Sequence, residues 1–513
     1  SESRYAEIAK EMYSGNDYLH PKLLDVHHYH KPPLTYYITA LGYRIFGINE
    51  FGARFFLQVA LIVQLIFVYH IALLLFSDKK TALHTSLIYF SLPLMLISVR
   101  NLTTDAYLNT FILGSIFFWL KHKAAIVKKS YFLYLFFIFL GLIMNTKGPV
   151  GMLFPLVFIA SYSVIFKKKL VVNAHVIAGF AAFLIISLLW TVLLYIEDPS
   201  ILDYFINDQI LNRITSKSFD RGKPFWFYVV VLPPAVLPWL FPLVAGLKLR
   251  TGRHFKPDRI TRLLVVNIAV MVLIFSIFNT KLILYVLPVS AIIAMLTAKC
   301  LVASGKKKLK AYNTFIMILT GVFLLALYLL PVLDATFSIR YLDLTGLTLL
   351  SLVAFRPGFR VIASGDPFRT SYFGYVFGAV MMLGSVIFFS SNDTKIHSLK
   401  SVTDFITDTL PDKSIVVYNY LLPSASFYTD KKIITINDGH NTVMRDLRFE
   451  KNSNCENYLI NARNPSGMAT LDSLFESGIV LVTRKKHQLR KNLLYLQQKL
   501  NHRKSFDTWI IYY

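Results

Sequence analysis

The sequence predicts a multi-pass α-helical membrane protein that ends in a small soluble α/β domain. Of its 513 residues, 55% are apolar and only 16% are charged, whereas soluble globular chains carry about 25% charged residues. Most apolar residues fall in runs of roughly 17–25, the length that crosses a bilayer as a helix. We therefore divide the chain into a membrane domain at residues 1–391 and a soluble domain at residues 392–513.

Twelve apolar runs are expected to span the membrane. Nine are good candidates, namely Phe55–Phe76, Thr81–Val99, Val150–Phe166, Leu170–Ile196, Trp226–Leu247, Leu263–Thr280, Leu282–Ser304, Ala311–Leu333 and Ser371–Ser391. Three weaker ones are retained because the alternation of loops requires them, namely Asp105–Leu120, Tyr131–Met144 and Tyr341–Phe355. Because the chain starts abruptly in a charged segment, we expect a further span upstream of it.

Basic residues are distributed unevenly over the connections between the spans. One alternate set, which includes Lys79–Lys80 and Lys306–Lys310, holds 22 lysines and arginines, and the opposite set holds eight. Because Lys and Arg are enriched on the cytoplasmic side of membrane proteins, residues 1–54 and the soluble domain should face outward. Most of the net charge of +25 then contacts anionic lipid headgroups, so no nucleic-acid partner is implied.

The soluble domain should combine short strands with helices. Strand patterns occur at Ile415–Tyr418, Ile433–Ile436, Ile479–Thr483 and Trp509–Tyr513, and helix patterns at Leu399–Leu410, Ser424–Tyr428 and Lys485–Leu500. This alternation predicts a small α/β fold. It lacks a glycine-rich phosphate loop, so we interpret it as a recognition or stabilising module. Cys300 and Cys455 lie in different domains and are not expected to form a disulfide.

The outward loops are dense in ionisable and aromatic residues. The first begins with a helical pattern at Glu2–Met12, whose apolar side should lie on the membrane surface or on neighbouring helices. Lys281 and Tyr285 are four residues apart, which predicts that they share one helix face. Taken singly, each loop has an ordinary explanation as an interfacial helix or a snorkelling side chain.

Together, these loops bring cations and carboxylates to one face of the membrane. The cations are Arg4, Lys31, Lys147, Arg221 and Lys281, and the carboxylates are Glu2, Asp105, Asp208 and Asp220. Arg and Lys bind phosphate through charge-assisted hydrogen bonds, and tyrosines suit the polar end of an amphipathic lipid. The pattern predicts a site for a lipid phosphate whose tail lies in the bilayer.

The order of motifs resembles one family of membrane enzymes. SESRYAEIAKEM followed by HYHKPPLTYYITALGYRIFG is similar to membrane glycosyltransferases of the aminoarabinose–lipid A transferase type, which are distantly related to lipid-phosphate-mannose protein mannosyltransferases. Later pieces follow in the family order, namely Thr104-Asp105, Thr146–Pro149, Asp220–Tyr228, Lys281–Pro288 and Leu422–Tyr428. The likeness covers nearly the whole chain, and its specificity lies in the ordered set.

The resemblance implies a GT-C type fold of about thirteen spans in the bacterial inner membrane, with the site and the C-terminal domain in the periplasm. It implies a polyprenyl-phosphate sugar as donor and lipid A, another glycan or a protein as acceptor, amid membrane lipids. The residues matching donor-phosphate contacts are Arg4, Tyr5, Lys31, Lys281 and Tyr285.

Catalysis is assigned to the carboxylates of Glu2 and Asp105. We expect Glu2 to orient or deprotonate the acceptor with support from Asp105, while a structural role for Glu2 at a helix N-terminus stays open. Two departures from the family pattern bear on this, since Ser1 replaces an aspartate and His30 replaces a glutamate. Further candidate site residues are His30, Lys147, Asp220 and Arg221.

Cofactors and rival functions complete the expectations. No cofactor is assigned, because the sugar arrives on the lipid, and no metal ligand is named, although His27, His28 and His30 leave a divalent metal open. A transporter or flippase of lipid-linked molecules is the rival function, but transporters usually hold ionisable residues near mid-membrane. An inactive lipid-binding homologue is a third alternative, because of Ser1.

Overall fold

The computed structural model of the chain describes residues 2–124, 130–169, 171–211, 222–249, 258–359, 366–392, 399–440, 443, 447–450, 453–476, 478–487, 489–506 and 508–513. The chain divides into two compact units, and each is described by itself. The first comprises Ser1–His30, Tyr36–Ala53 and Phe389–Tyr513, and the second comprises Lys31–Thr35 and Arg54–Phe388.

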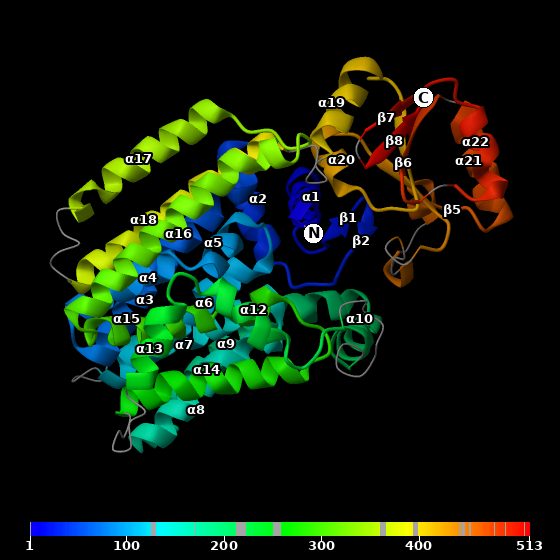
Figure 1. Ribbon diagram of the computed structural model, residues 1–513. Coiled ribbons are helices and arrows are strands. Elements are labelled where there is room, and N and C mark those ends of the chain that lie inside the picture. Colours follow the sequence, from blue (N-terminus) through cyan, green and yellow to red (C-terminus); the bar gives the residue numbers. More distant parts are fainter. Residues whose placement is uncertain are drawn as a thin grey trace. The chain divides into compact units, whose positions relative to one another are not determined.

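The second unit is a bundle of helices (Figure 1). Its elements are α3 (Glu50–Phe76, entering from the first unit), α4 (Lys79–Phe90), α5 (Pro93–Arg100), α6 (Thr104–Ala124), α7 (Ser130–Lys147), η1 (Pro149–Met152), α8 (Leu153–Phe166), α9 (Ala174–Glu197), α10 (Ser200–Asp203), η2 (Tyr204–Leu211), α12 (Phe227–Ala235), α13 (Leu240–Leu249), α14 (Arg259–Ile277), η3 (Ile283–Val286), α15 (Val289–Val302), α16 (Lys306–Leu333), α17 (Tyr341–Phe359) and α18 (Pro367–Ser391, ending in the first unit).

Membrane-spanning helices account for most of this unit. Among the described residues, seven helices are long and apolar enough to cross a membrane, and nine are if each of two bent pairs is one span. The pairs are α4 with α5, bent by 60°, and α12 with α13, bent by 109°. The predicted class, a multi-pass helical membrane protein with a small C-terminal α/β part, is therefore confirmed.

Nine of the twelve predicted spans correspond to these helices, and the other three do not meet the same test. Tyr341–Phe355 and Asp105–Leu120 are helical, as α17 and α6. Helix α6 has Asp105 in its first turn and Lys121, His122 and Lys123 in its last turn. The third of these runs, Leu282–Ser304, is interrupted by η3, so that α15 is only 14 residues long. The count of twelve stays a prediction.

A buried polar network holds α3, α4 and α6 together. The hydroxyl of Tyr89 donates to Gln64 Oε1 at 2.6 Å, and Asn109 Nδ2 donates to the same oxygen at 3.0 Å. Gln64 Nε2 in turn donates to Thr110 Oγ1 at 2.9 Å. Polar side chains inside a membrane bundle associate in this way because hydrocarbon offers them no partner. The network fixes the rotation of α6 about its axis.

The two bends are joined to each other by a hydrogen bond. Trp239 Nε1, between α12 and α13, donates to Ser91 Oγ, between α4 and α5, at 2.6 Å, and both residues are fully buried. Helix α18 covers this contact with two glycines four residues apart. A Cβ at Gly374 would lie 2.0 Å from the Trp239 ring, and one at Gly378 would lie 2.8 Å from the Ser91 Cα. Small residues at this spacing let membrane helices approach closely.

The first unit contains a six-stranded sheet with strand order β5-β4-β3-β6-β8-β7. Its elements are α1 (Glu2–Gly15), β1 (Lys22–Leu23), β2 (Val26–His27), α2 (Leu34–Phe46, of which the part from Tyr36 belongs here), α19 (Lys400–Thr409), β3 (Ser414–Tyr418), α20 (Pro423–Thr429), β4 (Ile433–Asn437), η4 (Leu447–Phe449), η5 (Ser453–Asn457), β5 (Leu459–Asn461), α21 (Pro465–Glu476), β6 (Ile479–Arg484), η6 (Lys491–Leu493), α22 (Leu494–Gln498), β7 (Arg503–Ser505) and β8 (Trp509–Tyr512).

Four strands of this sheet pair in parallel, and β8 and β7 extend it by antiparallel pairing. β3 lies between β4 and β6, and β4 pairs with β5, all in parallel, whereas β8 runs antiparallel to both β6 and β7. The central strands are apolar almost throughout, as parallel strands buried on both faces are. Their core includes Val416, Ile436 and Leu481, with Leu471 of α21 and Leu493 of η6.

Two features of this unit differ from the sequence expectations. The predicted helix Lys485–Leu500 is wrong, because residues 485–487 form a turn and only η6 and the short α22 are helical. Helix α1 was assigned to the membrane domain, but in the structure it packs on α20 of the C-terminal part. Of the two supports predicted for its apolar side, a neighbouring helix is therefore the one observed, and Ile8, Ala9 and Met12 are fully buried.

Candidate functional site

In the second unit, two predicted site residues from different loops form an ion pair. Lys147 Nζ lies 2.5 Å from Asp105 Oδ1, and both side chains are 11% exposed. Asp105 stands in the first turn of α6, where Thr103 Oγ1 donates to its Oδ2 at 3.1 Å. Lys147 is the last residue of α7, which stops because Gly148 adopts a φ of +81°, the left-handed conformation that ends many helices.

Tyr285 joins this pair. The Lys147 Nζ atom lies 4.5 Å from the centroid of the Tyr285 ring, a distance at which an ammonium is attracted to the ring face. A carboxylate, an ammonium and a phenol thus meet where α6 begins, α7 ends and η3 connects α14 to α15. We call Asp105, Lys147 and Tyr285 the Asp105 cluster.

Lys281 does not share a helix face with Tyr285, so that expectation is wrong. It precedes η3 in an extended segment, is 3% exposed, and donates from Nζ to the carbonyl oxygens of Lys223 at 2.9 Å and Phe278 at 2.5 Å. The same segment forms a bridge between Gly222 and Thr280. Lys281 therefore ties two connecting segments together through their main chains.

The other predicted site residues are placed as follows. Lys31, in the second unit, is half-buried before two prolines. Asp220 and Arg221, like Ser1, lie outside the described residues. In the first unit, Glu2 and Arg4 occupy the first turn of α1, and Arg4 is exposed. The Tyr5 ring lies 5.7 Å from the ring of Tyr36.

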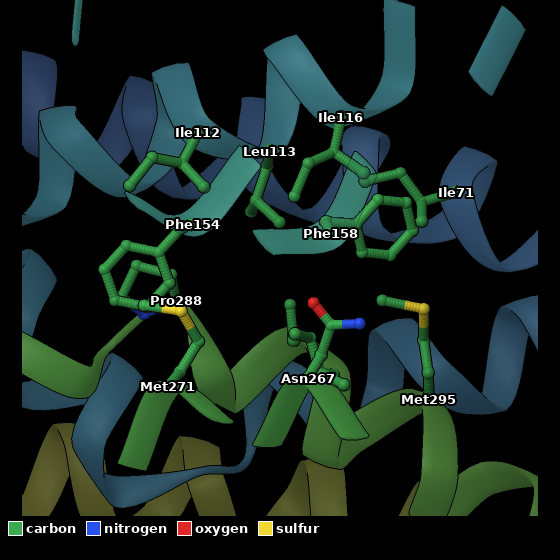
Figure 2. A pocket seen from close by; sticks show the side chains of 12 residues that line it. Ile71, Ile112, Leu113, Ile116, Phe154, Phe158, Asn267, Met271, Pro288 and Met295 are labelled. Carbon is green, nitrogen blue, oxygen red and sulfur yellow. The ribbon is translucent and has the colours of Figure 1, made fainter. Parts of the chain in front are cut away.

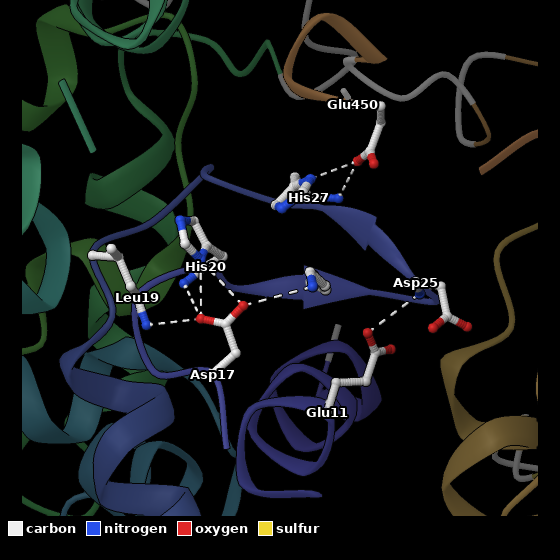
Figure 3. A network of polar contacts seen from close by, with 8 residues as sticks. Glu11, Asp17, Leu19, His20, Asp25, His27 and Glu450 are labelled. Carbon is white, nitrogen blue, oxygen red and sulfur yellow. Dashed lines mark hydrogen bonds and ion pairs between the residues drawn. The ribbon is translucent and has the colours of Figure 1, made fainter. Parts of the chain in front are cut away.

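The predicted histidine cluster is divided between different contacts. His28 and His30 stack with ring centroids 4.1 Å apart, whereas His27 Nδ1 lies 2.8 Å from Glu450 Oε1 (Figure 3). Within the described ranges, no three His, Cys, Asp or Glu side chains are grouped as metal ligands would be.

Three ionisable residues of α1 that the sequence analysis did not select are among the most buried charged groups of the first unit. Burial raises the pKa of Glu7 to about 7 and that of Glu11 to about 8. Glu11 accepts hydrogen bonds from the main-chain N–H groups of Leu24 and Asp25, the second of which is drawn in Figure 3. Lys10 donates to the Ser426 carbonyl oxygen and pairs with Asp430, both at 2.8 Å.

The signal for these residues was present in the sequence. At about 100° per residue, Glu7 and Glu11 fall within about 100° of Ile8 around the helix, and Lys10 falls beside Ala6, so charged residues flank the apolar side. An amphipathic helix with charges on its apolar side is a sign of a polar partner, here the carbonyl end of α20.

A small apolar cavity lies further along α6, on the C-terminal side of Asp105 (Figure 2). Ile112, Leu113 and Ile116 line it, seven to eleven residues after Asp105 and hence about 10–17 Å along the helix. Phe158 of α8 and Asn267 of α14 face the same space. Asn267 is fully buried, and its Oδ1 has no hydrogen-bond partner among the described residues.

Comparison with known proteins gives a consistent assignment of the fold. Residues 30–190 match the family model described as dolichyl-phosphate-mannose-protein mannosyltransferase. The whole chain superposes on 93% of a crystal structure of ArnT from Cupriavidus metallidurans bound to undecaprenyl phosphate, with a TM-score of 0.77 and 17% sequence identity. That likeness shows a shared fold.

Sequence relatives are named for one activity. The undecaprenyl phosphate-alpha-4-amino-4-deoxy-L-arabinose arabinosyl transferase of Photorhabdus laumondii is 28% identical over 327 residues, which cover 62% of this chain and 59% of that protein. The protein of the same name from Aeromonas hydrophila is 27% identical over 397 residues, or 75% of this chain and 67% of that one. The chain thus spans about three fifths of the first of these relatives. The resemblance and the GT-C type fold predicted from the motifs are confirmed.

Proposed function

We propose that this chain, which matches the mannosyltransferase family model and shares the fold of an aminoarabinose transferase, is a glycosyltransferase that takes a sugar from a polyprenyl phosphate. The acceptor would be a glycolipid such as lipid A, another glycan or a protein. The observation that carries the proposal is the Asp105 cluster, an ion pair and a phenol at one end of the helix bundle.

The cluster has the groups that this reaction needs. In the transfer, the bond between the anomeric carbon and the phosphate oxygen breaks, a bond from that carbon to the acceptor forms, and the acceptor loses a proton. A cation stabilises the charge that builds up on the leaving phosphate, and a carboxylate takes or orients the acceptor proton. Lys147 is such a cation and Asp105 is such a carboxylate.

Residues near the start of the chain would supply the remaining roles. Arg4, Tyr5 and Lys31 would contact the donor phosphate, as the family resemblance implies, and Glu2 would orient the acceptor. Lys281 contributes indirectly in this scheme, because its ammonium is directed at main-chain carbonyls.

The positions of the ion pairs favour transfer over transport. Three ion pairs of the second unit, Lys147–Asp105, Lys299–Asp258 and Arg340–Asp343, each lie at or beside a helix end. A transporter path would place ionisable residues near the middle of the spans. We also propose that the chain lies in the inner membrane, with the cluster and the C-terminal unit on the periplasmic side, as the distribution of basic residues indicates.

Activity is tested with the purified full chain and a polyprenyl-phosphate sugar. Mass spectrometry of lipid A, surface glycans and proteins from cells with and without the gene identifies the acceptor first. Transfer should then require donor, acceptor and an intact cluster, and Asp105→Asn and Glu2→Gln should lower the rate by about 10²–10⁴-fold. A near-normal rate in Glu2→Gln would make Glu2 structural, and no transfer from any donor, with donor still bound, would favour the inactive lipid-binding homologue.

Orientation is tested with single cysteines in a background in which Cys300 and Cys455 are replaced. Both native cysteines are buried, whereas Asn501 and Lys307 are exposed. In intact spheroplasts, Asn501→Cys should react with an impermeant thiol reagent and Lys307→Cys should not. The reverse labelling pattern would invert the proposed topology.

A further inference from the structure

The sheet of the first unit has a point at which its strand order reverses. From β3 the chain passes through α20 to β4 and then to β5 on one side of β3, whereas β6 pairs with β3 on the other side. In open α/β sheets, ligands bind outside the carboxyl ends of the strands at such a point. A ligand site in this unit is therefore expected at the residues that follow β3, β4, β5 and β6.

A buried carboxylate stands at this edge. Asp438 directly follows β4 and its side chain is 3% exposed. Its Oδ2 accepts a hydrogen bond from the Tyr418 hydroxyl at 2.7 Å and lies 2.9 Å from Arg490 Nε. Arg463, just after β5, lies with Nε 3.6 Å from Oδ1. One carboxylate thus faces two guanidinium groups.

The main chain around Asp438 is shaped to hold those groups. The Asp438 carbonyl oxygen accepts from Arg463 Nη2 at 2.9 Å and from Arg490 Nη2 at 3.1 Å. Gly439 has a φ of +84°, and a Cβ there would lie 2.0 Å from Arg463 Nη2. Glycine is therefore required both for the backbone angle and for the approach of the guanidinium. Asn419 fixes the same loop by accepting from the N–H groups of Asp438 and His440, both at 3.2 Å.

The second arginine is more than Asp438 needs. Arg490 and Tyr418 already satisfy Oδ2 at short distance, and Arg463 adds only a longer contact to Oδ1. Both arginine side chains remain 51% exposed. Their contacts with Asp438 use Nε and Nη2, and among the described residues no hydrogen bond or ion pair involves either Nη1 group.

Further positive charge surrounds the pair. The rings of His440 and His487 lie 4.8 Å apart at this edge, after β4 and β6. Arg484, Lys485 and Lys486 follow one another at the end of β6. The guanidinium of Arg484 packs on the Tyr420 ring at 4.5 Å. The edge therefore carries Arg484, Lys485 and Lys486 in addition to the two arginines that face Asp438.

We propose that the carboxyl edge of this sheet, between Arg463 and Arg490, binds a phosphate group carried by a lipid or a sugar. A guanidinium presents two parallel donors that match two phosphate oxygens, which makes arginine the preferred residue for bidentate phosphate recognition. Asp438 holds both groups by Nε and Nη2. The Nη1 groups of the two arginines remain, and together they can donate to two oxygens of one phosphate. The site is separate from the Asp105 cluster, and it does not depend on the proposed glycosyl transfer.

The test measures phosphate binding by the purified full chain in detergent. Inorganic phosphate is one probe, and phosphatidic acid in mixed micelles is the other, with phosphatidylcholine micelles as the lipid control. Binding is followed by calorimetry and by the shift in thermal unfolding temperature. The variants are Arg463→Gln and Arg490→Lys, and Arg503→Gln on β7 is a matched exposed control.

We expect both Arg463→Gln and Arg490→Lys to weaken phosphate binding by about tenfold or more, the loss of one charge-assisted pair, while Arg503→Gln binds normally. Arginine-dependent binding of phosphatidic acid alone would identify a lipid headgroup as the source, and binding of both probes would indicate a phosphate that need not be on a lipid. If Arg490→Lys unfolds, Arg463→Gln decides, because its contact with Asp438 is the longer one. Equal binding by Arg463→Gln and Arg503→Gln would overturn the proposal.

Discussion

Lys147 Nζ and Asp105 Oδ1 lie 2.5 Å apart at the adjoining ends of α7 and α6, with both side chains almost entirely shielded from solvent. An ion pair in such a place is strongly interdependent, because either partner alone would be a charge without compensation. The pair also means that a donor phosphate approaching Lys147 must compete with Asp105 for its protons.

A double-mutant cycle should reveal this interdependence. Asp105→Asn and Lys147→Met should each destabilise the protein by about 3–5 kcal/mol, since each leaves one buried charge unpaired. The double variant should be more stable than the sum of the two losses predicts, and inactive in transfer. Thermal unfolding of all four proteins measures the coupling, and additive losses would show that the two groups act independently.

Lys281→Met should affect stability more than donor binding. The ammonium of Lys281 donates to two main-chain carbonyls, and leaving both unsatisfied costs about 1–3 kcal/mol each. We expect a lower unfolding temperature and an unchanged KM for the donor in the enzyme that remains folded. A raised KM at an unchanged unfolding temperature would instead make Lys281 a phosphate ligand.

Arg4→Ala should abolish transfer without disturbing the fold. Arg4 is exposed on the first turn of α1, where substitutions change stability by less than about 0.5 kcal/mol. Loss of a phosphate-stabilising cation should lower the rate by about 10²–10³-fold. Arg44→Ala, at the exposed end of α2, is the control, and equal rates in the two variants would remove Arg4 from the site.

The docking of α1 should weaken as pH rises from about 5 to 8. The pKa values of Glu7 and Glu11 rise from 4.5 to about 7 and about 8 in the folded protein. The folded state therefore holds more protons than the unfolded state in this range, and stability falls with pH. The stability that these two carboxyl groups contribute is therefore fully present below pH 4.5, their ordinary pKa. It is lost as the pH rises through the folded values of about 7 and about 8.

Hydrogen exchange of the α1 amides at pH 5.5 and pH 8 measures this effect. Exchange should be faster at pH 8 than the intrinsic base catalysis of exchange explains. The excess corresponds to a free energy of opening of α1 that is lower by on the order of 2–3 kcal/mol per carboxyl. Glu7→Gln should remove much of the difference, because glutamine cannot ionise. If hydrogen exchange of α1 has the same pH dependence in the wild-type protein and in Glu7→Gln, the raised pKa of Glu7 is contradicted.

Gly374→Ala should destabilise the second unit by about 1–3 kcal/mol, the usual effect of overpacking. The new methyl group would meet the Trp239 ring at 2.0 Å and push apart α18 and the bend that holds Trp239. Gly346→Ala on α17 is the matched control, because nothing lies within 4 Å of its added Cβ. Thermal unfolding should separate the two variants, and similar unfolding temperatures would show that the helices adjust freely.

Sequence periodicity was sufficient for the elements whose apolar runs are long. It located the regular spans, and it found β3, β4, β6 and β8, because buried strands are short apolar runs. It missed the breaks at Ser91 and Trp239, since both bends lie inside continuous apolar stretches and depend on a contact between distant segments. It also assigned a helix to Lys485–Leu500, where the basic residues instead follow the end of β6.

The candidate site was predictable in its chemistry but not in its pairings. Loop composition selected Asp105, Lys147 and Tyr285, yet no local pattern indicates that Lys147 contacts both of the others. Lys281 was grouped with Tyr285 by helical spacing, and the grouping failed because the chain is extended before η3. Pairings of this kind are set by the packing of α6, α7 and the η3 connection, which single-sequence spacing does not contain.

The contact between Lys10 and Ser426 joins residues 416 positions apart in the chain. During synthesis at about 5–20 residues per second, α1 emerges roughly 20–80 s before its partner helix α20 exists. Its apolar side and Glu7 must therefore stay uncovered, or be held by another protein, while the intervening helices insert. Completion of the first unit is then a late event, and a chain interrupted before α20 would expose the apolar side of α1, which quality control can recognise.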